Sequence, residues 1–272
     1  MFGRRVSVSM MALLFASTVP AAAAEPLQPV KPWIVNYDTV ECTAQRSYGD
    51  PSNPIILALG PSAAADTYEL MIVTRGHGPT YAEEAKGSVD FGNGPIKAWL
   101  VRFALPKASQ MNAVKFRISG ADARQAVSAS LVTFHMDGRA DVSFSLQAIP
   151  ALFKTLEDCT SSLKHYWNMV DPEQQSIAAP AKGDLRSLFN WRDYPAEALD
   201  RSQEGEVQFL LFVNEKGKVA ACHVVRPSGI PVLDGMGCQV ITQRASFRPA
   251  RDHRGEPIRS AIVTPPINWR LH

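Results

Sequence analysis

The spacing of hydrophobic and polar residues divides the chain into regions of different character. From Trp33 to about Val170, short apolar runs alternate with polar residues and are separated by turn residues such as Asp137-Gly138, a pattern typical of β-strands. The runs are IILALG (55–60), YELMIVTRG (68–76), KAWLVRFAL (97–105), NAVKFRIS (112–119), SLVTFHM (130–136) and ADVSFSL (140–146). This region therefore predicts a β-sandwich or a half-barrel.

The spacing becomes helical after the last of these runs. Apolar residues then recur as Ile149, Leu152, Phe153, Leu156, Leu163 and Trp167, which indicates one helix. A helix of this length could close one end of the sheet. The polar, proline-containing stretch 171–190 follows and is interpreted as a linker.

Residues 191–272 predict a smaller unit made of helix, strand, strand, helix and strand. The run EVQFLLFVNEKGKVAACHVV (206–225) is typical of a β-hairpin with its turn at 214–217. A short helix begins near Pro195, and Pro231 begins a second helix. The last strand, IRSAIV (258–263), precedes two prolines, which favour a sheet edge because they cannot donate to a ladder. We therefore predict an α+β fold, with a small antiparallel sheet and two helices behind a mainly-β domain.

The first 24 residues are typical of a cleavable secretory signal. Arg4 and Arg5 precede a 14-residue apolar run and the small residues Ala22-Ala23-Ala24. The run is shorter than the ~20 residues of a spanning helix, so cleavage and release to the periplasm are favoured over an inner-membrane anchor. The predicted organisation is a signal peptide (1–24), a β-rich domain (25–170), a linker (171–190) and a C-terminal domain (191–272), with no membrane span after cleavage.

Charge and cysteine content narrow the function classes. The net charge of +2 falls to 0 when the two arginines of the leader are removed, so no general argument favours nucleic acid or an anionic membrane. In an oxidising compartment, Cys42, Cys159, Cys222 and Cys238 are predicted to form two disulfides. Pairing Cys42 with Cys159 would tie the start of the β-rich domain to its end. Chain-entropy models predict a stabilisation of roughly 4–5 kcal/mol for such a long loop.

The adjacent Cys222 and His223 also allow a metal site or a reactive thiol with its base. Neighbouring residues on a strand point to opposite faces, so the two side chains cannot share one ion, and a zinc site needs about four ligands. A structural disulfide is therefore favoured, and we predict neither a metal nor another cofactor. The basic residues Arg244, Arg248, Arg251, Arg254 and Arg259 could meet an acidic partner or an anionic polymer, but interspersed acids favour a solvated surface.

Short motifs in residues 191–272 occur in a recognisable order. They are Tyr194-Pro195-x-x-Ala198, Gly205-x-Val207, Lys216-Gly217-Lys218-Val219, Ser228-Gly229, Leu233-Asp234, Phe247-x-Pro249-Ala250, Gly255-x-Pro257 and Ile267-x-Trp269. Together they resemble the C-terminal domain of the TonB family, periplasmic proteins that couple inner-membrane energy to outer-membrane transporters. The resemblance covers under a third of the chain. Some members of the family carry a paired cysteine on the second strand and the following helix, where Cys222 and Cys238 fall.

The resemblance implies a binding function at an exposed strand. In the family, a short segment of a transporter adds to a sheet edge, where backbone hydrogen bonds supply much of the affinity. The residues here that match the recognition strand are Arg259, Ser260, Ala261, Ile262 and Val263. The alternative interpretation is an edge that simply stays solvated, guarded by an arginine and two prolines.

Two features depart from force-transmitting members of the family. The N-terminal segment contains no histidine, since the first is His77, and a folded β-rich domain replaces the long proline-rich spacer. We therefore expect a non-enzymatic periplasmic protein that pairs with an outer-membrane transporter or another envelope protein. The alternatives are a disulfide-stabilised scaffold or homodimer without energy transduction and, as a third class, a hydrolase with its site in residues 25–170. No set of nucleophile, base and orienting group is visible in that region.

Overall fold

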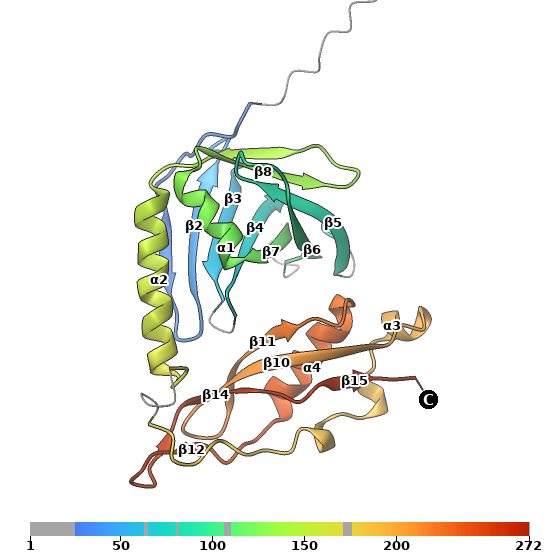
Figure 1. The fold of residues 1–272 in the computed structure, drawn as a ribbon. Coiled ribbons are helices and arrows are strands. Elements are labelled where there is room, and N and C mark those ends of the chain that lie inside the picture. Colours follow the sequence, from blue (N-terminus) through green and yellow to red (C-terminus); the bar gives the residue numbers. More distant parts are fainter. Residues whose placement is uncertain (1–24, 63–64, 80–81, 106–109, 171–175, 272) are drawn as a thin grey trace, which may run out of the picture.

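The computed structural model describes residues 25–271 except 63–64, 80–81, 106–109 and 171–175. The signal-peptide prediction lies outside the described residues. Figure 1 shows a β-rich N-terminal part above a smaller C-terminal sheet, with one long helix running down beside both.

The N-terminal part contains a strongly curved antiparallel sheet of nine described strands. In spatial order the strands run β1-β2-β3-β4-β7-β6-β5-β8-β9. Their bounds are β1 Ile34–Tyr37, β2 Cys42–Tyr48, β3 Ile55–Pro61, β4 Thr67–Arg75, β5 Glu83–Asp90, β6 Ile96–Ala104, β7 Met111–Ser119, β8 Leu131–Met136 and β9 Val142–Ser145. Leu27 forms a bridge to Phe144 of β9, and Pro29 forms one to Tyr48 of β2. These bridges bring the two sides of the curved sheet together, so the half-barrel prediction is confirmed.

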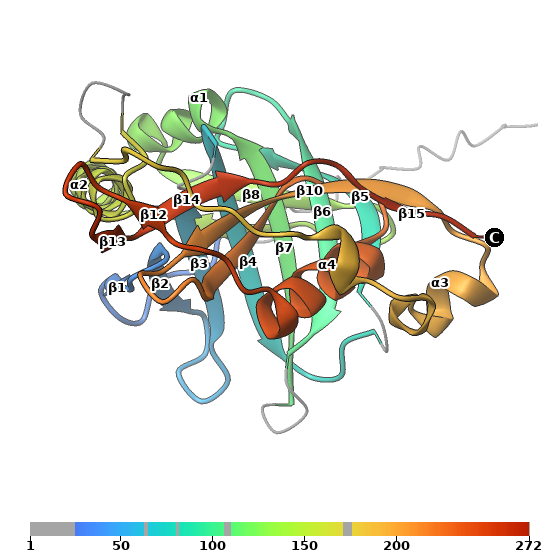
Figure 2. The ribbon, with the colours of Figure 1, turned by 90° about the horizontal axis from the view of Figure 1, so that it is seen from below.

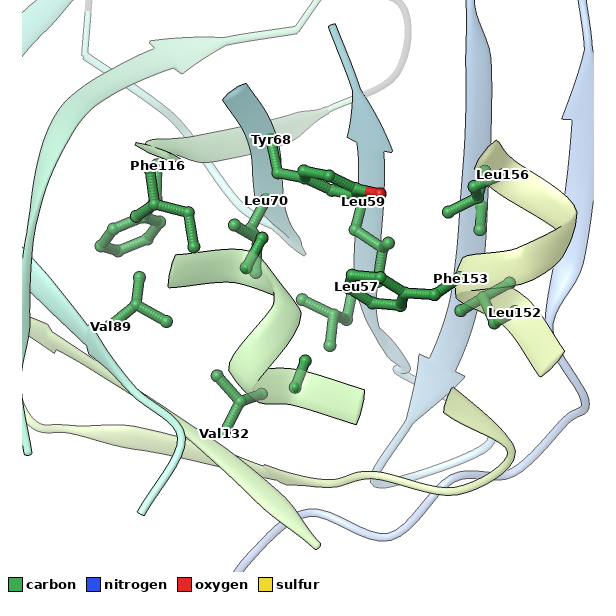
Figure 3. Close-up of a cluster of buried hydrophobic side chains, with 14 of the residues drawn as sticks. Leu57, Leu59, Tyr68, Leu70, Val89, Phe116, Val132, Leu152, Phe153 and Leu156 are labelled. Carbon is green, nitrogen blue, oxygen red and sulfur yellow. The ribbon is translucent and has the colours of Figure 1, made fainter. Parts of the chain in front are cut away.

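The hollow of the half-barrel is filled by short helical segments and closed by one long helix. The short segments are α1 (Gly120–Ala123) and η2 (Arg124–Ser128), and the long helix is α2 (Ile149–Tyr166). Figure 3 shows side chains of α2 pointing toward leucines of β3 and an aromatic residue of β4. The Tyr68 and Phe153 rings stack with centroids 5.2 Å apart. Alternating strand residues thus supply one wall of the core and a helical stripe supplies the other.

Three strands of the N-terminal part were not predicted from the hydrophobic pattern. Strands β1 and β2 contain few consecutive apolar residues, and β5 has the sequence EEAKGSVD. Glu83 and Glu84 at the start of β5 are exposed. Only Val89 of β5 is fully buried. Three of its residues are exposed and four are only partly buried, so the strand gives little hydrophobic signal.

The C-terminal part follows the predicted order of elements and adds short strands. Its elements are α3 Ala196–Asp200, β10 Gly205–Val213, β11 Val219–Arg226, α4 Pro231–Arg244, β12 Ala250–Arg251, β13 Pro257–Ile258, β14 Ser260–Val263 and β15 Ile267–Trp269. In the sheet, β10 lies between β11 and β14, and β15 pairs with the first residues of β10. Gly217 adopts a positive φ of 73° in the predicted turn, a conformation that favours glycine.

Both faces of this sheet are covered. Phe209 and Leu211 of β10 lie in the core beneath α4, and a Cβ on Gly237 of α4 would come within 2.5 Å of the Phe209 ring. Leu210 and Phe212, which point the other way, belong to the core of the half-barrel. The run FLLFV in β10 is therefore continuously buried, because the half-barrel covers the face opposite α4.

The end of α2 forms the joint between the two parts. Trp167 is buried, its ring centroid lies 4.9 Å from that of Phe212, and its indole N–H donates to the Thr39 carbonyl at 2.5 Å. Figure 2 shows α2 beside the end of the C-terminal sheet where β14 begins. One side chain therefore packs in the half-barrel and against the second sheet at once.

Two disulfides connect helices to strands, as predicted. Cys42 of β2 is bonded to Cys159 of α2, across 117 residues of sequence. Cys222 of β11 is bonded to Cys238 of α4, across 16 residues. The first fixes α2 to the half-barrel, and the second fixes α4 to the small sheet.

Candidate functional site

The candidate site is the outer edge of β14. Within the described residues, β14 pairs with β10 on one side and with no strand on the other. Ile262 lies opposite Leu211 and Ala261 lies opposite Phe212. Figure 1 shows the edge running along the border of the C-terminal sheet.

The hydrogen-bond register determines which backbone groups face outward. The Thr264 N–H donates to the Phe209 carbonyl at 2.8 Å. Antiparallel ladders alternate bonded and non-bonded pairs, so Ile262 and Ser260 direct their backbone groups toward β10. Ala261 and Val263 direct theirs away from it, and the Val263 side chain is 59% exposed. A partner strand would find its donors and acceptors at these two residues.

The beginning of the predicted strand is already engaged by the N-terminal part. The Asn168 side chain donates to the Arg259 carbonyl at 2.7 Å. The Arg259 guanidinium lies 3.8 Å from the centroid of the Tyr166 ring, and its Nε is 3.0 Å from Glu215 Oε1. Of the five predicted residues, Arg259 is thus committed to contacts within the chain. The unpaired edge is confined to residues 261–263.

A threonine at the other end of β14 was missed by sequence reasoning. The Thr264 Oγ1 accepts a hydrogen bond from the Phe209 N–H at 3.1 Å and so replaces a ladder carbonyl just before the two prolines. Thr264 and Ser260 are both buried. These polar residues, together with Asn168, set the length of the open edge. In the sequence, Thr264 is marked only by its place before a proline pair, and Asn168 only by its place after a predicted helix.

The cysteine and histidine of β11 are separated as strand geometry requires. Cys222 is bonded to Cys238 on the α4 face, whereas the His223 ring packs edge-on against Phe212 on the opposite face, with centroids 5.3 Å apart. Burial lowers the pKa of the His223 imidazole below its usual value. Among the residues that the structure describes, no group of three or more potential ligands is placed to hold a metal ion.

Three of the five arginines between residues 244 and 259 form ion pairs within the C-terminal part. Arg244 makes a paired contact with Asp193, both distances being 2.7 Å. Arg254 pairs with Asp252 at 3.3 Å, and Arg259 pairs with Glu215, as described above. These contacts neutralise much of the run inside the C-terminal part.

A cleft of about 560 Å³ lies between the outer face of the half-barrel and the β11–α4 segment. Glu69 in this cleft contacts Lys115 at 3.1 Å and Arg117 at 2.6 Å. Burial acts to raise the pKa of Glu69, but the charges and hydrogen bonds of the two cations outweigh it and lower the pKa. Sequence reasoning missed this cluster, although its charged residues occupy alternating, outward positions of β4 and β7. The Glu69 carboxylate on β4 is therefore paired with both cations of the neighbouring strand β7.

The comparison with family models agrees with this geometry. Residues 191–271 match the model described as Gram-negative bacterial TonB protein C-terminal. Residues 191–271 are a TonB C-terminal domain. The comparisons with curated proteins and with solved structures give no match.

The family assignment limits the functions of this part of the chain. The TonB C-terminal domain is a non-enzymatic protein-interaction domain, and its presence indicates a TonB-like envelope protein. The family and the two disulfides together suggest an envelope or periplasmic location. None of the described helices is long and apolar enough to cross a membrane.

Proposed function

We propose that the protein acts in the periplasm by binding an extended segment of an outer-membrane transporter, or of another envelope protein, along β14. The observation that carries this proposal is the edge at residues 261–263, which no described strand pairs and which carries the exposed Val263 side chain. In β-augmentation the partner gains backbone hydrogen bonds, and side-chain pockets add selectivity. The proposal connects the protein with energy-dependent transport across the outer membrane.

The rigid surroundings of the edge support this function. The Cys222–Cys238 disulfide holds α4 against β11, and Asn168, just after α2, holds Arg259 immediately before β14. An edge held in its bound shape loses little conformational entropy when a partner binds. Its short length also limits accidental pairing with other chains.

The experiment removes one outward donor without changing the β10–β14 ladder. Val263→Pro deletes an N–H that points away from β10, and Val263→Thr keeps this N–H with a similar shape. The full exported chain and both variants are used to capture transporters from an outer-membrane extract, and amide exchange is then measured in the captured complex. Loss of one hydrogen bond, worth about 1 kcal/mol, together with the bulk of the ring, predicts roughly tenfold weaker capture by the proline variant.

Each outcome has a defined meaning. Capture by the wild type and the threonine variant, with protection of the 261 and 263 amides, supports the proposal. Equal capture by the proline variant overturns it. A wild-type chain that captures no transporter but forms dimers sensitive to Val263→Pro would favour the scaffold alternative.

A further inference from the structure

A second surface lies beside β15, where the edge of β14 continues. A groove of about 700 Å³ separates β15 from the segment 185–194, and we refer to it as the aromatic groove. Its volume lies within the range of ligand pockets. Its main lining residues are apolar or aromatic: Phe189, Trp191, Tyr194, Leu199, Pro266 and Trp269.

The floor of the aromatic groove is rigid. Trp269 is buried and meets the rings of Phe189 and Tyr194 edge-on, with centroids 5.6 and 5.4 Å away. The Tyr194 hydroxyl donates to the Gln203 carbonyl at 2.5 Å. Edge-to-face contacts and a satisfied hydroxyl fix the rings, so the groove is formed before any ligand arrives.

One wall presents an exposed tryptophan on a fixed turn. Trp191 is 80% exposed, yet the turn that carries it is tied down. Asn190 and Asp193 form a reciprocal capping box around the turn, and Asp193 is paired with Arg244 at 2.7 Å. Trp191 therefore extends the apolar lining of the groove into solvent, and contiguous exposed apolar patches mark interaction sites.

The charged residues that the structure describes in the groove are all cations. The charged lining residues are Arg186 and Arg270, and the guanidinium of Arg192 lies 5.3 Å from the Trp191 ring. Arg270 pairs with Glu204 at 3.1 Å. Among the described residues, neither Arg186 nor Arg192 forms an ion pair. Charge complementarity therefore requires acidic groups on the occupant.

The groove is continuous with the proposed partner edge. Strands β14 and β15 follow each other on the same side of β10, separated by Thr264 and the two prolines. Figure 2 shows them in one line. A strand advances about 3.3 Å per residue, so four further residues of a segment paired with β14 would reach past Pro266 to the groove.

We propose that the aromatic groove binds the continuation of the extended segment that pairs with β14, and that it selects an apolar or aromatic side chain flanked by acidic residues. This inference rests on the proposed function, because it assigns sequence preference to the same partner. Backbone pairing at residues 261–263 does not depend on the partner's sequence. The aromatic groove supplies the part of recognition that does.

The test uses three synthetic peptides that share eight residues of alternating Thr and Val. The first adds the tail Glu-Leu-Phe-Glu, the second Lys-Leu-Phe-Lys and the third Glu-Ser-Ser-Glu. Each tail is placed at either end of its peptide, since an added strand can run in either direction. Binding to the full exported chain is measured by fluorescence anisotropy. The Glu-Leu-Phe-Glu peptide is expected to bind about tenfold more tightly than the other two.

Variants separate the groove from the edge. Trp191→Ala should weaken the Glu-Leu-Phe-Glu peptide about tenfold and leave the Glu-Ser-Ser-Glu peptide unchanged. Arg186→Glu should reverse the preference for the Glu tail over the Lys tail. Tyr37→Ala and Arg254→Glu are matched controls, since they change exposed residues away from the groove and should alter nothing.

The results distinguish failure of this inference from failure of the proposed function. In one outcome, all three peptides bind equally, with an affinity that Val263→Pro lowers and Trp191→Ala does not change. This result overturns the proposed role of the groove and supports pairing at the edge. Selective binding that Val263→Pro does not affect overturns the edge and the continuity argued here. Binding of none of the peptides overturns both.

Discussion

Replacing Phe212 with alanine should separate the two parts of the molecule, whereas replacing Phe209 should not. Both phenylalanines lie on β10 and are fully buried. Phe209 faces α4, but Phe212 lies 4.9 Å from Trp167 at the joint. The pair therefore offers one substitution on each face of the same strand.

The expected size of the effect follows from burial. Replacing a buried phenylalanine with alanine costs about 3–5 kcal/mol. The Phe212 ring divides its aromatic contacts between Trp167 across the joint and His223 within its own sheet. If about half of the cost, roughly 2 kcal/mol, falls on docking, the equilibrium between docked and separated parts shifts about 30-fold.

Small-angle scattering and hydrogen exchange measure this equilibrium. Phe212→Ala should enlarge the radius of gyration and increase exchange around Trp167, while the exchange of the half-barrel strands stays slow. Phe209→Ala should increase exchange in β10 and α4 with less change in radius. An equal increase in radius for both variants, or no increase for Phe212→Ala, would refute the assignment of the joint to the Phe212 face.

Two further predictions concern the cysteines and the buried histidine. Chain-entropy estimates for loops of 16 and 117 residues give about 3 kcal/mol for Cys222–Cys238 and about 5 kcal/mol for Cys42–Cys159. In each variant both cysteines of one disulfide are replaced by serine. Urea unfolding should show the larger loss of unfolding free energy for the Cys42–Cys159 pair, and the reverse order would contradict the chain-entropy estimate. Because burial lowers the folded-state pKa of His223, its contribution to stability is present above about pH 6.5 and is lost as the pH falls toward the folded pKa. Between pH 7.5 and 5, the free energy of unfolding should therefore fall less for His223→Phe than for wild type. Equal slopes of this free energy against pH would contradict this role.

The C-terminal elements were predictable because local signals agree there. The hairpin, its glycine turn and the proline that begins α4 all point to the same structure, and the motif order identifies the family. The open part of the edge was less predictable. Its length depends on Asn168 and Thr264, which contact residues distant in the sequence. The spacing of apolar and polar residues along the chain does not predict such contacts.

The N-terminal part shows the same limit at the level of strands. Strand β5 escaped prediction because one of its faces is solvated and polar, although β6 and β8 pair with it on both sides. The burial of both faces of β10 was visible only as an unusually long apolar run. Its cause, a half-barrel packed against the second face, is a tertiary feature that the run alone does not specify.

Coverage of both faces of the C-terminal sheet has a consequence for self-assembly. A second copy cannot stack on this sheet and can join it only edge to edge. At β14 such a union would place two antiparallel copies of the strand about a two-fold axis, and the contact would close after two chains. A dimer of this kind would use the same outward groups of residues 261–263 that a partner needs, so the affinity for the partner would fall as the concentration of the protein itself rises.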